Sequence, residues 1–148
     1  MINSQYKHYV LEQCSVPQEN VFGEPMMRQT ALALGLVISH IEDKYSDDTI
    51  YSIFPSDQII DNHREFFNAV ETAFDAANKL NSLVTIGIEP NNPSSLFGYI
   101  QFSKTQDTQN EQRIDDYLFD RGVRKSINFV EKPDEETATM FINSGSFV

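Results

Sequence analysis

An acidic turn in the middle of the chain places a carboxylate where sheets of α/β proteins bind their ligands. Residues 50–54 form a short, mostly apolar run that favours a buried strand. Pro55 ends this strand because proline has no amide hydrogen to donate to a neighbouring strand, and Asp57 follows it. In open α/β sheets, ligands bind beyond the carboxyl ends of the strands. Asp57 is therefore a candidate ligand-binding residue, and a turn or helix-cap role is the alternative at such a position.

A charged pair, Glu131 and Lys132, follows another predicted strand and precedes Pro133. In isolation, such a pair is usually solvent-exposed and contributes little to stability. The three histidines have no spacing typical of a metal site or a catalytic triad. Cys14 is the only cysteine, which excludes an internal disulfide and a cysteine metal cluster.

Helical and strand patterns alternate along the chain, and this alternation predicts an α/β fold with a three-layer, mostly parallel sheet. Helix 27–41 is apolar on most sides, which predicts that it is buried. Strand 83–88 is almost continuously apolar, as in a sheet covered on both faces. Phe66, Phe67 and Phe74 recur at helical spacing and are expected in the core. The predicted helices are 4–13, 27–41, 63–79 and a segment from Asp134, and the predicted strands are 20–23, 50–54, 83–88, 98–102 and 123–130.

Helix 63–79 begins after Asn62, and Glu65 three residues later completes the pattern of a capping box. Residues 89–95 contain two prolines and two asparagines and are expected to form a loop. The polar stretch 103–116 has no periodic apolar residues and is predicted to be an exposed excursion.

Length and charge narrow the function classes. A chain of 148 residues has room for one domain, here 1–148. A formal net charge of -11 argues against general binding to nucleic acid or a membrane surface, and a nucleotide held at one local site remains compatible with it. No apolar run is long enough to span a membrane, and the first residues lack the apolar core of a signal peptide. We therefore expect a cytoplasmic protein.

Four motifs in the same order resemble those of the sugar nucleotidyltransferases, most closely the mannose-1-phosphate guanylyltransferases. Together they cover nearly the whole chain. The resemblance implies a partial nucleotide-diphospho-sugar transferase fold, which is Rossmann-like. The motifs are Glu-Pro-Met-Met-Arg-Gln-Thr-Ala at 24–31, Phe-Pro-Ser-Asp-Gln-Ile-Ile at 54–60, Thr-Ile-Gly-Ile-Glu-Pro with Phe-Gly-Tyr-Ile at 85–90 and 97–100, and Phe-Val-Glu-Lys-Pro-Asp at 129–134.

By this resemblance, the chain would act on GTP and mannose-1-phosphate with Mg²⁺ as the cofactor. The oxygen of the sugar phosphate would attack the α-phosphorus of GTP, and pyrophosphate would leave. The resemblance implies that Asp57 is a catalytic ligand of Mg²⁺, a cation that prefers carboxylate and phosphate oxygens. It implies that Glu131 accepts hydrogen bonds from sugar hydroxyls and that Lys132 holds the sugar phosphate as a second catalytic residue.

The resemblance also implies roles for one glycine near the sugar and for three residues near the nucleotide. Gly98 would let the backbone approach the sugar, because glycine has no side chain in the way. Arg28, Gln29 and Thr30 would lie near the nucleotide.

The chain also departs from the family pattern. The glycine-rich opening loop and a later metal-binding aspartate have no counterpart, and Gln29, Gln58 and Leu96 stand where the family usually has Asn, His and Gly. We therefore expect a central part of such an enzyme that is inactive alone, and that self-associates or is completed by a partner chain. The alternatives are a non-catalytic subunit, interaction module or relic, or a pyrophosphorylase for another sugar or base.

Overall fold

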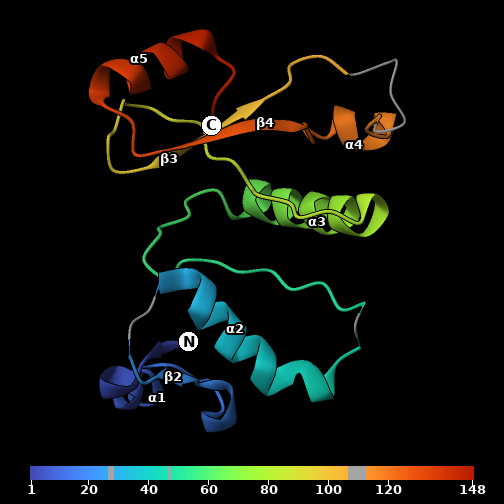
Figure 1. Cartoon of the computed structure of the whole chain (residues 1–148). Helices are drawn as coiled ribbons and strands as arrows, with labels where there is room; N and C mark the ends of the chain where they lie inside the picture. The colour runs from blue at the N-terminus through green and yellow to red at the C-terminus, as the bar shows by residue number, and fades with distance from the viewer. Residues whose placement is uncertain (27–28, 47, 107–112) are drawn as a thin grey trace. The chain divides into compact units, whose positions relative to one another are not determined.

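The computed structural model describes residues 1–26, 29–46, 48–106 and 113–148. They divide into two compact units, Met1–Tyr51 and Ser52–Val148 (Figure 1). The expectation of one domain stays a prediction. None of the helices in these described ranges combines the length and apolar character that crossing a membrane requires.

The first unit is built around a short parallel strand pair and one longer helix. β1 pairs in parallel with β2, with Ile2 opposite Gly23. Among the described residues of this unit, the buried apolar one is Val21, just before β2. The elements are β1 (Ile2–Asn3), η1 (Ser4–Tyr6), α1 (Lys7–Gln13), η2 (Gln18–Asn20), β2 (Gly23–Glu24), α2 (Gln29–Ile41) and η3 (Glu42–Lys44).

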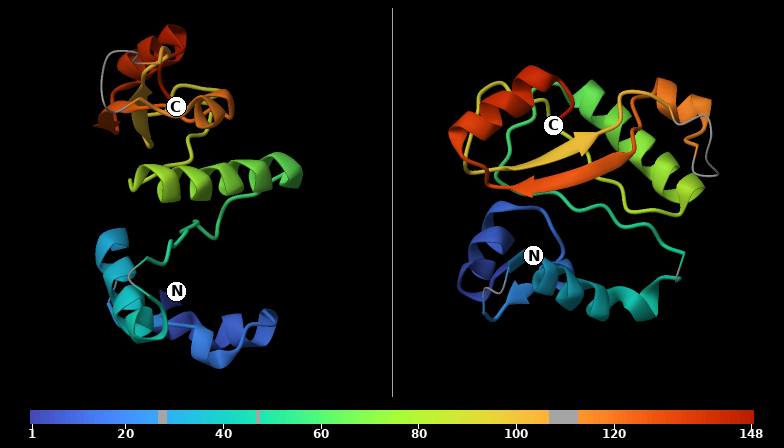
Figure 2. Two further views of the ribbon diagram at one scale, coloured as in Figure 1. Left: turned by 90° about the vertical axis from the view of Figure 1, so that its right-hand side faces the viewer. Right: turned by 45° about the horizontal axis from the view of Figure 1, so that its top comes forward.

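The second unit contains an antiparallel sheet with a helix on each side. The chain end extends the sheet, because Ile100 and Val148 exchange backbone hydrogen bonds of 2.8 and 3.1 Å. α5 and α3 lie on opposite sides of the strands (Figure 2). The elements are α3 (His63–Leu80), β3 (Gly98–Phe102), α4 (Asp116–Asp120), β4 (Ser126–Glu131) and α5 (Glu135–Ser144).

The core of the second unit lies between the sheet and α5. Tyr99 of β3 is 2% exposed, and its ring centroid lies 5.7 Å from that of Phe141 on α5. Phe141 in turn stacks on Phe147 at 4.0 Å. The Tyr99 hydroxyl accepts a hydrogen bond from the Ser94 amide and donates one to the Ser94 carbonyl, which ties the predicted loop 89–95 to β3. On the other side of the unit, Leu118 of α4 is fully buried.

Two strand predictions were wrong. Neither residues 50–54 nor residues 83–88 form a strand. Both segments expose their apolar side chains, with Ile53 54% and Leu83 104% exposed. A strand needs a neighbouring backbone to satisfy its amide and carbonyl groups. Within the described residues, no backbone hydrogen bond joins either segment to another part of the chain.

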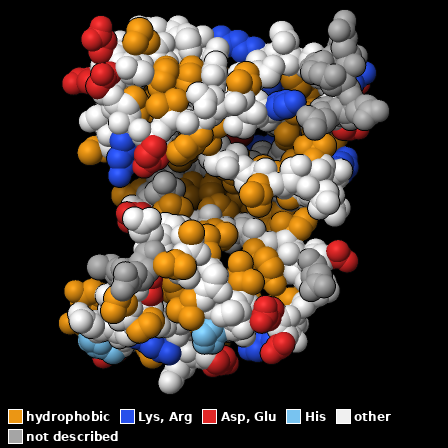
Figure 3. Space-filling view, in the orientation of Figure 1, with side chains coloured by type: hydrophobic (Ala, Val, Ile, Leu, Met, Phe, Trp, Pro, Cys, Tyr) orange, Lys and Arg blue, Asp and Glu red, His pale blue; other side chains and the backbone are white. Residues whose placement is uncertain are grey.

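Burial predictions for two helices also failed. α2 forms over most of 27–41, although residues 27 and 28 lie outside the described residues, and none of its described residues is buried. On α3, Phe67 is 63% and Phe74 is 37% exposed, so these rings are not core residues. In both units hydrophobic side chains therefore reach the surface, as Figure 3 shows. The helical spacing predicted for the apolar residues of α2 and α3 was correct, but the apolar residues of α2 and the rings of Phe67 and Phe74 are not buried by other described elements.

The remaining elements agree with the sequence to within a few residues. The helix predicted at 4–13 is η1 followed by α1, and the strands predicted at 20–23 and 123–130 are shifted to β2 and β4. α4 was not predicted. It begins at the end of the polar stretch 103–116, of which residues 107–112 lie outside the described part of the chain. The mixture of helices with a parallel strand pair agrees with the α/β class, whereas β3 and β4 are antiparallel.

Candidate functional site

Three of the predicted site residues meet where β3 begins and β4 ends. The antiparallel register places Gly98 directly opposite Glu131. Gly98 also faces the ring of Phe129, because a Cβ at position 98 would lie 2.5 Å from Phe129 Cζ and 3.0 Å from Glu131 Oε2. The absence of a side chain at Gly98 therefore lets the Phe129 ring and the Glu131 carboxylate lie close to the backbone at this position.

Lys132 continues from β4 into this site with an unusual backbone conformation. Its φ angle is +46°, in the left-handed region that non-glycine residues seldom adopt. The Lys132 amide donates a 3.2 Å hydrogen bond to the Phe97 carbonyl, which holds the two chain segments together beyond the last strand pair. Strained backbone of this kind is often found at functional sites and costs about 1–3 kcal/mol.

The charged groups of Glu131 and Lys132 lie side by side in solvent. Lys132 Nζ is 3.7 Å from Glu131 Oε1, and the two side chains are 63% and 59% exposed, respectively. An exposed pair at this distance adds little to stability. Both groups are therefore accessible to a ligand, the carboxylate as a hydrogen-bond acceptor and the ammonium group as a partner for an anion.

Asp134 fixes the turn that follows this pair. Its side chain accepts a 2.8 Å hydrogen bond from the Thr137 amide and so caps α5. Hydrogen bonds from the side chain and the backbone of Thr137 lower the pKa of Asp134 below its usual value of 3.8. The carboxylate is therefore charged at neutral pH and stabilises the first turn of α5.

Asp57 is exposed in the irregular segment that precedes α3. The prediction that it follows a strand was wrong, because residues 50–54 are extended but unpaired. In the ranges that the structure describes, no three His, Cys, Asp or Glu residues gather as a metal-binding group. Within those ranges, Asp57 therefore belongs to no group of three or more such ligands.

The three residues predicted near the nucleotide belong to the first unit. Arg28 lies outside the described residues. Gln29 and Thr30 form the start of α2, where both are exposed, and Gln29 has a positive φ angle of 68°.

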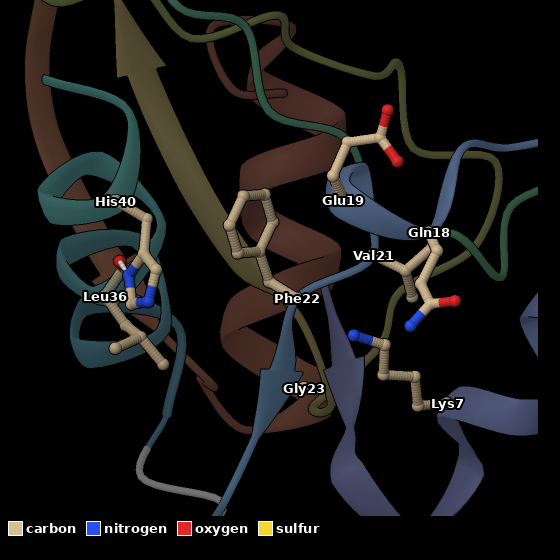
Figure 4. A pocket seen from close by; sticks show the side chains of 8 residues that line it. All are labelled: Lys7, Gln18, Glu19, Val21, Phe22, Gly23, Leu36 and His40. Carbon is tan, nitrogen blue, oxygen red and sulfur yellow. Dashed lines mark hydrogen bonds between the residues drawn. The ribbon is translucent and has the colours of Figure 1, made fainter. Parts of the chain in front are cut away.

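A hollow of about 610 Å³ lies elsewhere in the first unit (Figure 4). Phe22 stands edge-on to His40 at 5.4 Å between ring centroids, and the Nδ1 atom of His40 lies 2.8 Å from the Leu36 carbonyl. Lys7 and Glu19 also line the hollow. Among the described residues, none of the site residues predicted from the sequence lines this hollow.

Sequence reasoning missed Phe129 and Phe97, which the structure places around Gly98. Phe129 precedes Glu131 by two positions on the same strand, so both point to one face of the sheet. That alternation was a usable signal. The contact of Phe97 with Lys132 depends on the pairing of two distant segments, which no local pattern specifies.

A family model described as "Nucleotidyl transferase" matches residues 2–148. The chain is 30% identical over 150 residues to the mannose-1-phosphate guanylyltransferases of Escherichia coli and Klebsiella pneumoniae, and each match covers 98% of this chain and 29% of the relative. It is 28% identical over 148 residues to the alginate biosynthesis protein AlgA of Pseudomonas putida, covering 98% of this chain and 28% of that protein. The chain thus spans less than a third of the length of these relatives. These matches confirm the resemblance seen in the sequence motifs, and the chain belongs to the nucleotidyl transferase family.

Proposed function

We propose that the chain provides the sugar-phosphate half-site for guanylyl transfer, in which GTP and mannose-1-phosphate give GDP-mannose and pyrophosphate. The observation that carries the proposal is the register that brings Gly98, Glu131 and Lys132 together at one end of the β3–β4 pair. The guanylyltransferase names of the relatives support the choice of sugar phosphate and nucleotide.

The proposed reaction is a displacement at phosphorus. An oxygen of the mannose-1-phosphate group forms a bond to the α-phosphorus of GTP. The bond from that phosphorus to the bridging oxygen breaks, and pyrophosphate leaves with the electron pair. Catalysis of such a transfer depends mainly on positioning and on stabilising the developing charge.

In this proposal each of the three grouped residues has one role. Glu131 accepts hydrogen bonds from sugar hydroxyls, and its exposed carboxylate is a suitable acceptor. Lys132 holds the phosphate group through its ammonium charge. Gly98 lets a sugar approach the backbone once the exposed Phe129 ring turns aside, because glycine itself has no side chain in the way.

The nucleotide and metal contacts complete the proposal. Gln29 and Thr30 are proposed to contact GTP together with Arg28. Asp57 is proposed to hold Mg²⁺, because its carboxylate is exposed and Mg²⁺ in nucleotide sites is bound by one or two carboxylates plus substrate phosphates. When bound, Mg²⁺ offsets the negative charge of the phosphates.

The test is isothermal titration of the purified chain with mannose-1-phosphate and Mg²⁺, without GTP. We expect binding, and we expect Lys132→Ala to weaken it at least tenfold, or by about 1.4 kcal/mol. The matched control is Lys44→Ala, an exposed lysine of η3 in the first unit, which should leave binding unchanged. A folded chain that does not bind the sugar phosphate, or a Lys132→Ala variant that binds it equally well, would contradict the half-site.

A direct assay of GDP-mannose formation with GTP and Mg²⁺ separates two versions of the proposal. Binding of the sugar phosphate without turnover indicates a half-site that a second component must complete. Turnover by this chain alone indicates that its own residues complete the catalytic site.

We also propose a cytoplasmic location, which cell fractionation with an antibody to the chain would test.

A further inference from the structure

A wide groove of about 1150 Å³ lies within the second unit. One wall is α3 and the extended segment that follows it, and the other is the face of the sheet that α5 does not cover. Apolar side chains from both walls line it, including Val84, Ile86, Ile100, Phe102 and Phe129. The groove thus separates two apolar surfaces that would be favourable to bury.

The segment Leu83–Ile88 is the part of the groove most suited to bind another chain. It is extended and apolar, and within the described residues its backbone makes no hydrogen bond to another segment. Gly87 packs tightly against the chain end, since a Cβ there would lie 2.4 Å from Val148 Cγ2. The segment is therefore held beside the sheet with its backbone donors and acceptors available, which makes it a template for strand addition.

The charge of the groove is opposite to that of the chain. Lys79, Arg113, Arg121, Arg124 and Lys125 line it, and of these Arg113 is paired with Asp116 at 2.6 Å and Arg121 with Asp75 at 3.6 Å. The five cations outnumber these two carboxylates in a chain of net charge -11. No Asp or Glu is among its described lining residues. Lys79 and Arg121 are both held over the Tyr117 ring, at 4.4 and 5.3 Å from its centroid. A partner that carries carboxylates would gain from this arrangement.

We propose that the groove binds an extended, β-strand-forming polypeptide segment with apolar side chains and at least one carboxylate. Its source would be nucleotidyl transferase sequence of the kind the relatives carry in the two thirds or more of their length that this chain does not match. The backbone of the segment pairs with Leu83–Ile88, its apolar side chains cover Ile86 and Phe102, and its carboxylate meets the cationic rim. A second copy of this chain is disfavoured as the occupant because two chains of net charge -11 repel each other.

This inference does not depend on the sugar-phosphate site. The probe is a set of overlapping 15-residue peptides covering the part of the Escherichia coli mannose-1-phosphate guanylyltransferase that this chain does not match. Labelled peptides are titrated with the full chain by fluorescence anisotropy, and hydrogen exchange is measured with and without each peptide that binds. We expect at least one strand-forming peptide to bind and to slow the exchange of the amides of Leu83–Ile88.

Two variants distinguish the groove from other apolar surfaces. Ile86→Lys places a charge in the groove and should weaken peptide binding at least tenfold. Ile59→Lys is the matched control, because Ile59 is 92% exposed and does not line the groove. Lys79→Gln should weaken the binding of peptides that carry carboxylates, and the effect should shrink at high salt.

Three results would overturn the proposal. The first is that no peptide binds a chain whose circular dichroism shows it is folded. The second is that protection from exchange appears outside Leu83–Ile88 or is unaffected by Ile86→Lys. The third is concentration-dependent self-association in sedimentation experiments that protects Leu83–Ile88 without any peptide, which would identify a second copy as the occupant.

Discussion

Replacing Gly98 by alanine tests the packing of the candidate site and its proposed role together. The new Cβ would lie 2.5 and 2.9 Å from two carbons of the Phe129 ring, far closer than ordinary van der Waals contact. The ring must therefore turn away. Because Phe129 is 59% exposed, it can do so at low cost, and we expect a loss of about 1 kcal/mol, at the low end for an overpacked contact.

The effect of Gly98→Ala on ligand binding should be larger than its effect on stability. The added methyl group would also lie 3.0 Å from Oε2 of Glu131, the carboxylate proposed to bind the sugar. It therefore displaces the carboxylate and excludes the ligand at once. We expect binding of mannose-1-phosphate to weaken at least tenfold, or by about 1.4 kcal/mol.

Gly35→Ala is the matched control for the same chemical change. Gly35 lies inside α2, and no atom lies within 4 Å of the place its Cβ would take. Alanine is favoured over glycine in a helix interior by about 0.8–1 kcal/mol, so this variant should be stabilised. For a chain of this size, the gain corresponds to a rise in Tm of about 2–4 °C.

Both variants are measured by urea unfolding, followed by circular dichroism, and by titration with mannose-1-phosphate. The expected pattern is opposite in sign for stability, with weakened binding in Gly98→Ala alone. A Gly98→Ala variant as stable as Gly35→Ala would refute the close packing around Gly98. A destabilised Gly98→Ala variant that binds the sugar phosphate normally would refute the role of Gly98 in binding.

Three further predictions concern the elements that position the site. Leu118→Ala should lower the free energy of unfolding by about 2–5 kcal/mol in urea titrations, because Leu118 is fully buried, and a change below about 1 kcal/mol would contradict that packing. Asn62→Ala removes the acceptor for the Glu65 amide at the start of α3 and should cost about 1 kcal/mol, whereas Asn62→Asp should retain the cap. Because the folded-state pKa of Asp134 is lowered, its contribution to stability is complete above the unfolded-state pKa and is lost as pH falls through the folded-state value. Wild type should therefore be more stable than Asp134→Ala at neutral pH, and this advantage should diminish as the pH falls below the unfolded-state pKa; a difference that stays constant through acid titration would contradict the shift.

The helices and their ends could be predicted because their signals are local. Asn62 caps α3 through the Glu65 amide, and Asp134 caps α5 through the Thr137 amide, each with a partner three residues away. Gly145 ends α5 in the left-handed conformation, with a φ angle of 60°. Information of this kind lies within a single turn of the chain, so it does not depend on what packs around the helix.

The candidate site was predicted only in part because its geometry depends on pairing between distant segments. The motifs identified Gly98, Glu131 and Lys132, and the strand register then brought them together. The close contact of Phe129 with Gly98 depends on that register, which periodicity alone does not fix. The expected association of Asp57, Gln29 and Thr30 with the other three residues stays a prediction.

The two wrong strand predictions show what an apolar run in the sequence does and does not predict. The run Leu83–Ile88 has the composition of a strand covered on both faces, yet its backbone is unpaired and its side chains are exposed within the described structure. An apolar pattern records the burial that a segment requires, not whether its own neighbours supply it. The same mismatch occurs at residues 50–54 and along α2. The exposed apolar segment Leu83–Ile88 adjoins a groove lined by lysines and arginines in an acidic chain. Binding of an apolar strand that carries a carboxylate would bury the segment and also meet the positive charge of the groove.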